Sequence, residues 1–360
     1  MPPQALPVQE KTRDSPYSHI KQEPAPRKEW QYTPDSGTVK AQLAFRKKCL
    51  QALTKEEYRF LKTKSPLMHY YLGLRTMALY AVNVINIYHF RNNPLIWFPF
   101  VVWQGCLLVN TIFLMHESCH LLIFNDRNSS LNLFLEHWTM RFYGYWCHVS
   151  AVFFKEYHGQ HHHRFFRGED DPKSTHFVPH DGNWFKKIGY FGPGLIRVFR
   201  SLNNSVKTVS KATKETCIRD RKFNQLVLLS IMAYCTYNFG FANYLKLHFL
   251  PHVVFFPIFF MVNRCGQHYC CDPNHAIYQS TPMKGSFFAE CMFLYSGYHV
   301  EHHTFPEVPA YNLKLMNRLL GPRVYKKEGI CYWTYPRLVW GWLVQNRKPY
   351  TIWWDLAQTY

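Results

Sequence analysis

Histidines dominate the residues that could do chemistry, and they come in three tracts. The first is "HESCH" at residues 116–120, the second "HGQHH" at 158–162 and the third "HVEHH" at 299–303. The first tract is ambiguous alone. It fits H-E-x-x-H, in which two histidines hold zinc and the glutamate is the base of a metalloprotease. It equally fits a plain H-x-x-x-H metal motif, in which Glu117 is no ligand.

The number of histidines separates these two interpretations. On a helix, offsets of three and four residues bring each tract onto one face. The tracts together supply these imidazoles: His116, His120, His158, His161, His162, His299, His302 and His303. A catalytic zinc needs only three protein ligands and an open position. Two metal ions would use the whole set, and neutral imidazole suits iron as well as zinc, so the tracts predict a two-metal centre.

Apolar segments next to the tracts predict the elements that carry them. Residues 94–115 contain no charged residue and, at about 1.5 Å per residue, are long enough to cross a bilayer. The first tract follows directly. Residues 71–90 make a weaker candidate span, and 226–242 and 247–262 are typical of a transmembrane hairpin joined by a polar turn at 243–246.

Residues 131–154 are apolar but contain Glu136 and Arg141, which is typical of a re-entrant or interfacial segment. The segments 40–64, 155–224 and 314–348 are basic, which predicts that the termini and the long middle loop face the cytosol. We therefore predict an all-α membrane protein with about four transmembrane helices in two hairpins. Interfacial or re-entrant helices and a cytosolic His-rich cap complete this expected fold.

Composition supports a membrane rather than a nucleic-acid partner. The net charge is +19 and 47% of the residues are hydrophobic, clumped into spans between basic flanks. Residues 1–40 are rich in proline and predict a disordered tail, 41–325 form the expected membrane domain, and 326–360 are an aromatic, basic segment packed on it. The eleven cysteines form no paired framework, so we expect reduced thiols.

The spacing H-x-x-x-H, H-x-x-H-H, H-x-x-H-H resembles that of the integral-membrane fatty acid desaturase and hydroxylase superfamily. The similarity extends to Asp-Pro in "HGQHHHRFFRGEDDP" and to Phe-Pro, Val-Pro and Tyr-Asn-Leu in "GYHVEHHTFPEVPAYNLKLMNRLL". It covers about residues 65–325. The resemblance implies two iron ions, cycling between Fe2+ and Fe3+, with molecular oxygen as co-substrate and a lipid acyl chain as substrate.

Members of this superfamily usually supply one more ligand between the last span and the third tract. In this sequence His268 resembles that additional ligand, and His275 and Asn263 are the alternatives. Four carboxylates could orient the ligands through hydrogen bonds: Glu117, Asp170, Asp171 and Glu301. The two aspartates fit helix caps or solvated charges equally well.

Two further motifs are expected to lie outside the metal centre. His248 and His252 also form H-x-x-x-H, but they open the fourth predicted span on the membrane face opposite the three tracts. We predict a structural or interfacial role for them. The cysteines of "CGQHYCC" at 265–271 match no common zinc finger and are predicted to be buried thiols.

The resemblance implies an oxygen-dependent desaturase that introduces a double bond into a fatty acyl chain, nearest to the acyl-lipid or sphingolipid type. The sequence has neither G-x-G-x-x-G nor a fused haem motif, so an external donor of the cytochrome b5 or ferredoxin type is required, which basic patches could attract. A lipid or terpenoid hydroxylase or ketolase with the same di-iron site is the main alternative. A membrane zinc protease and a non-catalytic lipid- or metal-binding protein are the others.

The expected location is an integral, multi-pass position in a membrane, with the active site on the cytosolic side. In a eukaryote the resemblance implies the endoplasmic reticulum. Membrane lipids are then expected partners alongside the substrate and the electron donor, and nucleic acid is not.

Overall fold

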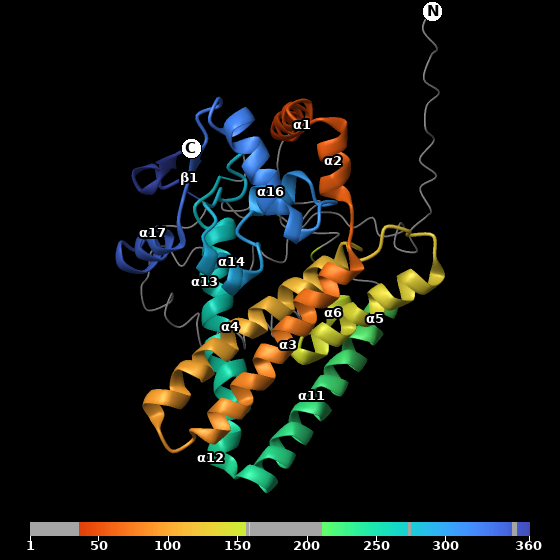
Figure 1. Ribbon diagram of the computed structural model, residues 1–360, viewed down its shortest axis with the longest axis vertical. Helices are drawn as coiled ribbons and strands as arrows, with labels where there is room; N and C mark the ends of the chain where they lie inside the picture. The colour runs from red at the N-terminus through yellow and green to blue at the C-terminus, as the bar shows by residue number, and fades with distance from the viewer. Residues whose placement is uncertain (1–35, 156–157, 159–210, 273–274, 348–350) are drawn as a thin grey trace, which may run out of the picture.

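The computed structural model describes residues 36–155, 158, 211–272, 275–347 and 351–360. Over these ranges the chain is mostly helical, and the strands are confined to one short antiparallel pair. Figure 1 shows long helices gathered at one end of the molecule and shorter helices forming a cap at the other. The predicted all-α architecture with a separate cap is therefore confirmed.

The described elements follow one another in three stretches. The first contains α1 (Ser36–Gln51), α2 (Lys55–Lys62), α3 (Pro66–His89), α4 (Pro94–Cys119), α5 (Ser130–Trp146) and α6 (Ala151–Lys155). The second contains α11 (Lys211–Phe239), α12 (Phe241–Tyr244), η2 (Leu245–Phe255), α13 (Phe256–His268), α14 (Phe287–Phe293), α15 (His299–Thr304), α16 (Ala310–Leu320) and η3 (Gly321–Tyr325). The last contains β1 (Cys331–Tyr332), α17 (Tyr335–Val339), η4 (Trp340–Val344), η5 (Trp354–Leu356) and β2 (Gln358–Thr359).

Helices α3 and α4 form the first hairpin, and their start points are encoded locally. Each begins with a proline at its first turn, where the missing N–H costs no hydrogen bond. Ser65 caps α3 by accepting the N–H of Met68, and Asn93 caps α4 by accepting the N–H of Leu95. The hairpin turn consequently falls between His89 and Pro94 and aims the far end of α4 at the cap.

The second hairpin joins α11 to the continuous helical run α12–η2–α13. Gly240 separates them with φ 82° and ψ 151°, a region that is open essentially to glycine alone. The predicted polar turn at 243–246 is wrong, because those residues are already helical. Polarity suggested a turn there, whereas backbone freedom at Gly240 determines where the chain reverses.

Two helical runs, Pro94–Cys119 and Phe241–His268, are long and apolar enough to cross a membrane, so the chain is an all-α membrane protein. The hairpin partners α3 and α11 carry large exposed apolar side chains: Leu74, Val82 and Ile85 on α3, and Leu226, Leu229 and Tyr237 on α11. Such contiguous apolar faces suit contact with lipid tails. The count of four spans stays a prediction.

The C-terminal segment packs on the cap. Trp353 is buried and donates its backbone N–H to Sγ of Cys270 at 3.2 Å, and Trp333 donates Nε1–H to the carbonyl oxygen of Trp353 at 3.1 Å. At the end of the chain, Nδ2 of Asn317 on α16 donates to the Tyr360 hydroxyl at 2.6 Å. At the other end, α1 begins at Ser36 and so overlaps the tail expected over 1–40; residues 1–35 lie outside the described part.

All eleven cysteines lie in described positions and are free thiols. Cys265, Cys270 and Cys271 are fully buried, as the sequence predicts.

We predict that Gly105 on α4 tolerates no larger side chain. A Cβ at this position would lie 2.4 Å from Cβ of Phe255 and 2.8 Å from the backbone nitrogen of Phe256. Gly105→Ala should lower the free energy of unfolding, because overpacking costs about 1–3 kcal/mol. Thermal unfolding in detergent measures this. Gly321→Ala is the matched control, since its added Cβ would lie 3.4 Å from the nearest atom; equal midpoints for the two variants would contradict the prediction.

Candidate metal centre

Seven of the predicted ligand histidines lie in the described residues, and they form two groups. Group A contains His116, His120, His158 and His302, and group B contains His268, His299 and His303. Within each group, one imidazole nitrogen from every member lies within 4.8 Å of the others. His161 and His162, like Asp170 and Asp171, lie outside the described residues.

Group A is assembled from three segments that are distant in the sequence. His116 lies in the last turn of α4 and His120 is the residue that ends this helix. The ring centroid of His116 lies 4.2 Å from that of His158, beyond α6, and 4.6 Å from that of His302 on α15. The apolar span therefore delivers the first tract directly to a shared site.

Group B joins the end of α13 to α15. Nε2 of His268 lies 2.8 Å from Nε2 of His299, which in turn lies 3.1 Å from Nε2 of His303. Two nitrogens that bind one ion at about 2.1 Å and a right angle are about 3.0 Å apart. The spacing in group B fits ligands of one metal ion.

The third tract is divided between the two groups. His299 and His303 belong to group B, whereas His302 faces group A. Successive residues on a helix point about 100° apart, so His302 and His303 diverge. The rings of all three residues still lie 4.6–5.8 Å from one another on one side of α15, so this helix brings the two groups together.

The donor set fits iron. Both groups consist of imidazoles in the part of the chain that the structure describes, and imidazole nitrogen binds iron, zinc and copper well. The short nitrogen–nitrogen distances show that little rearrangement is needed to bind an ion.

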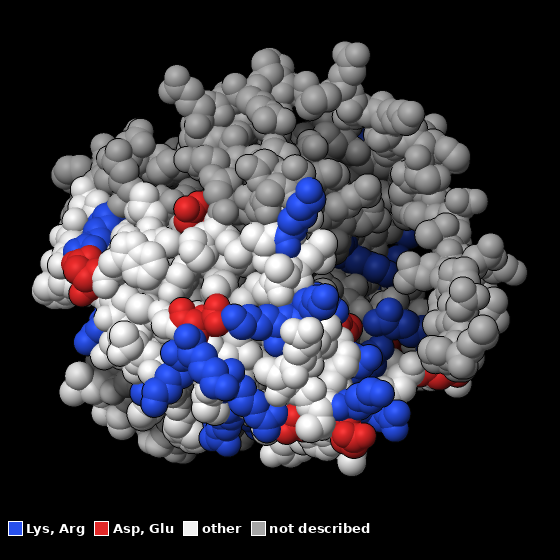
Figure 2. Space-filling model, turned by 90° about the horizontal axis from the view of Figure 1, so that it is seen from above, with Lys and Arg blue, Asp and Glu red and all other residues white. Residues whose placement is uncertain are grey.

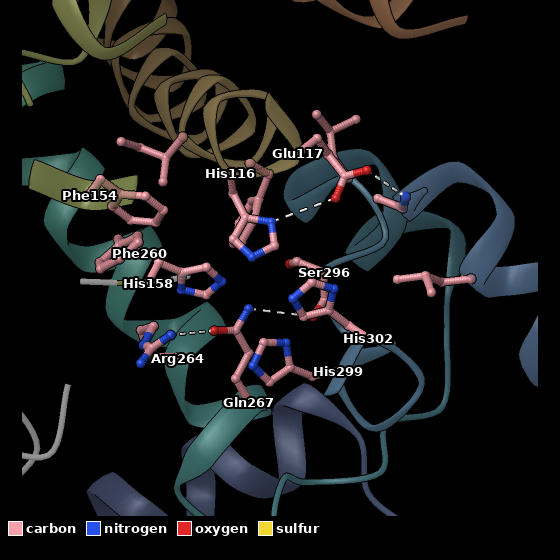
Figure 3. A pocket seen from close by; sticks show the side chains of 15 residues that line it. His116, Glu117, Phe154, His158, Phe260, Arg264, Gln267, Ser296, His299 and His302 are labelled. Atoms are coloured by element: carbon pink, nitrogen blue, oxygen red, sulfur yellow. Dashed lines mark hydrogen bonds and ion pairs between the residues drawn. The ribbon is translucent and has the colours of Figure 1, made fainter. Parts of the chain in front are cut away.

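Glu117 links group A to the cap. Its Oε2 accepts the backbone N–H of Ala310 at 2.7 Å, and its Oε1 lies 3.6 Å from Nδ1 of His116 (Figure 3). A carboxylate facing Nδ1 favours a proton there and leaves Nε2 to bind metal. Glu117 therefore lies where a partner that orients the ring of His116 would lie.

Glu301 has a different function from Glu117. Its Oε1 accepts hydrogen bonds from Nδ2 of Asn317 at 2.7 Å and from the hydroxyl of Tyr325 at 2.8 Å. Burial raises the pKa of Glu301, while these two hydrogen bonds oppose the shift. The carboxyl group therefore ties α15, which carries three of the predicted ligands, to α16 and η3.

The other ligand candidates lie outside both groups. Nδ1 of His275 accepts the backbone N–H groups of Ile277 and Tyr278 and so stabilises a turn. Oδ1 of Asn263 accepts hydrogen bonds from the hydroxyls of Ser296 and Tyr335. His248 and His252 also belong to neither group.

A cavity adjoins both groups (Figure 3). Its apolar wall consists of Ile112, Phe113, Phe154, Phe260, Leu294 and Leu313, and it also contacts His116, His158, His299 and His302. Arg264 and Gln267 close another side, where Nη1 of Arg264 donates to Oε1 of Gln267 at 2.7 Å. Ile112 and Phe113 lie about one helical turn before the first tract, so part of this wall could be found from the sequence.

The cavity sits where an apolar chain could meet both groups, and a family comparison agrees with this chemistry. The pattern of the family described as fatty acid desaturase matches residues 92–336, which include every member of groups A and B. The chain belongs to the fatty acid desaturase family. No curated protein matches the chain.

Membership of the desaturase family makes the chain an oxidoreductase with a lipid acyl substrate in a membrane setting. The two groups support the desaturase or hydroxylase type of di-iron fold. The zinc protease interpretation of "HESCH" loses its basis, because His116 and His120 share their group with two more imidazoles and Glu117 is bonded to Ala310.

We predict that Glu117→Gln weakens metal binding in group A alone. An amide that still accepts from Ala310 turns its NH2 toward Nδ1 of His116 and favours the wrong tautomer. Loss of such a partner typically reduces metal affinity about 10–100-fold. Competition with a chelator, followed by iron analysis, measures the effect.

The matched control is Glu136→Gln, a buried carboxylate on α5 that accepts the backbone N–H of Ile123 at 2.8 Å and contacts neither group. It should retain the iron of the unmodified protein. Equal chelator resistance of the Glu117 and Glu136 variants would contradict the assigned role of Glu117.

Proposed function

We propose that this protein is an oxygen-dependent di-iron desaturase that introduces a carbon–carbon double bond into the fatty acyl chain of a lipid, of the acyl-lipid or sphingolipid type. One observation carries the proposal: two groups of histidines adjoin a single apolar-walled cavity at the end of a membrane-spanning helix. An acyl chain is the substrate that such a wall accepts.

Groups A and B would each hold one iron, with His161 and His162 completing the set. Bound iron supplies oxygen activation and removal of hydrogen from an unactivated carbon. The chain's own residues do the positioning. Phe113, Phe154 and Phe260 exclude water and hold the methylene chain, while Glu117 fixes the tautomer of His116.

The reaction removes two hydrogen atoms from neighbouring carbons and reduces one oxygen molecule to two water molecules, so two electrons must come from a donor and two protons from the medium. Figure 2 shows Lys and Arg side chains gathered at the cap end of the molecule. Exposed members include Lys47, Lys55, Arg59, Lys326 and Lys327, which we call the basic face. This face suits an acidic carrier of the cytochrome b5 or ferredoxin type.

We place the basic face and the active site on the cytosolic side of the membrane, following the positive-inside rule. The protein is then a multi-pass membrane enzyme, located in the endoplasmic reticulum if the source is eukaryotic.

Lipid analysis tests the reaction. The chain is expressed in a host of defined lipid profile. Its acyl chains are compared by mass spectrometry with those of the same host expressing the His302→Ala variant. Desaturation gives a product lighter by two hydrogen atoms, which the His302 variant lacks. A product heavier by one oxygen atom would instead identify a lipid or terpenoid hydroxylase.

His268 and His275 provide a matched pair in the same assay. Removal of the group B ligand in His268→Ala should abolish the product, whereas His275→Ala should retain it, because His275 stabilises a turn only. The opposite pattern would make His275 the ligand.

The donor surface is tested by charge reversal. Lys326→Glu with Lys327→Glu should slow oxidation of reduced cytochrome b5 on the order of tenfold at low salt, because electrostatic steering is lost. Stopped-flow absorbance measures the rate. Arg91→Glu, at the opposite end beside the α3–α4 turn, is the control and should leave the rate unchanged. An equal effect of both variants would rule out docking on the basic face.

A further inference from the structure

A third cluster of histidines lies away from groups A and B. It consists of His148, His248 and His252, and one imidazole nitrogen from each lies within 4.8 Å of the others. His252 precedes His268 by sixteen residues on one continuous helical run, which at about 1.5 Å per residue places the cluster roughly 24 Å along the axis from group B. The proposed oxidation chemistry does not use it.

Two separate parts of the fold create this cluster. His248 and His252 lie one turn apart on η2, whose π-helical geometry accommodates Pro251. His148 follows the end of α5 and adopts φ 57°, a left-handed conformation that is uncommon outside glycine. The strained backbone at His148 turns its ring toward η2, with ring centroids 5.3 Å from His248 and 5.1 Å from His252.

The distances suit a metal ion. Nε2 of His148 lies 3.2 Å from Nε2 of His248. Two nitrogens bound tetrahedrally at about 2.05 Å are about 3.3 Å apart. The rings of His248 and His252 are stacked with their centroids 4.1 Å apart, and one nitrogen of each of the three rings lies within 4.8 Å of the others.

Hydrogen bonding fixes the tautomer of one member. Nδ1 of His252 lies 2.9 Å from the carbonyl oxygen of His248, which can only accept, so this nitrogen carries the proton. With the proton on Nδ1, His252 would bind a metal through Nε2. Metal-bound histidines commonly use the same arrangement, in which one ring nitrogen donates a hydrogen bond and the other binds the metal.

In each of the other two rings, one nitrogen has no hydrogen bond within the described residues. Nδ1 of His148 and Nδ1 of His248 are buried, and nothing in the described part of the chain hydrogen-bonds to them. His248 is only 7% exposed and His252 9%. Buried imidazoles inside a membrane protein are costly and usually mark a function.

We propose that His148, His248 and His252 form a third metal site, which binds one zinc-class divalent ion independently of the two irons. Three neutral nitrogens with an open fourth position are a donor set typical of zinc. The ion links the loop after α5 to the second hairpin. Because α6 begins three residues after His148 and His158 follows ten residues after it, the ion holds the approach to the second tract in place.

The test uses the full-length chain, produced with iron and zinc supplied and purified in detergent. Inductively coupled plasma mass spectrometry counts metals in the unmodified protein and in four variants: His148→Ala, His252→Ala, His69→Ala and His303→Ala. His69 is a buried histidine of α3 outside all three clusters. We expect one zinc per chain in the unmodified protein and in His69→Ala, and loss of zinc with unchanged iron in His148→Ala and His252→Ala.

X-ray absorption at the zinc edge of the unmodified protein requires no variant to fold. It should show imidazole nitrogens at about 2.0–2.1 Å and no sulfur. An unmodified protein without zinc, or zinc that persists in both cluster variants, would overturn the proposal. Zinc that disappears in His303→Ala but stays in His148→Ala would belong to group B and overturn it as well.

Discussion

The hydrogen bond between Glu117 and the backbone N–H of Ala310 joins the membrane helix to the cap, and the metal centre depends on that junction. It fixes the end of α4, where group A begins, against the start of α16. Glu301 then fixes α15 against α16 through Asn317. Two buried carboxylates thus hold the ligand helices from opposite sides, and the cavity lies between them.

Such support is needed because the ligands come from segments that do not attract one another. Imidazoles brought together in a buried site lose contact with water, and only a bound ion fully compensates for that loss. The structure therefore fixes the loop after the first tract independently of metal. Nζ of Lys64 donates to the carbonyl oxygens of Leu121 and Phe124, and Glu136 accepts the N–H of Ile123.

What the sequence could predict follows from how local each signal is. The span 94–115 was evident because a charge-free run needs no tertiary information, and α4 contains it entirely. The second hairpin turn lies at Gly240 and not at the predicted residues 243–246. The positive φ of Gly240 reverses the chain, and the polarity of the residues does not indicate that angle. The histidines of the third tract divide between two groups because of where α4 and α13 lie relative to α15. The spacing within the tract does not encode those positions.

The same limit explains His148. A single histidine in the segment predicted to be re-entrant or interfacial carries no spacing signal, and its partners lie about a hundred residues away. Only the fold, through a left-handed residue and a π-helix, brings the three rings together.

"HESCH" illustrates how one motif takes its meaning from its surroundings. On the last turn of α4, His116 and His120 point to one side and Glu117 is rotated about 100° from His116. In a protease that glutamate would reach a metal-bound water. In this fold the start of α16 occupies its side of the helix, so the carboxylate accepts a backbone N–H and keeps only an edge toward Nδ1 of His116. Glu117 therefore links α4 to α16 and does not act as a base, because the backbone of α16 occupies the side of α4 on which its carboxyl group lies.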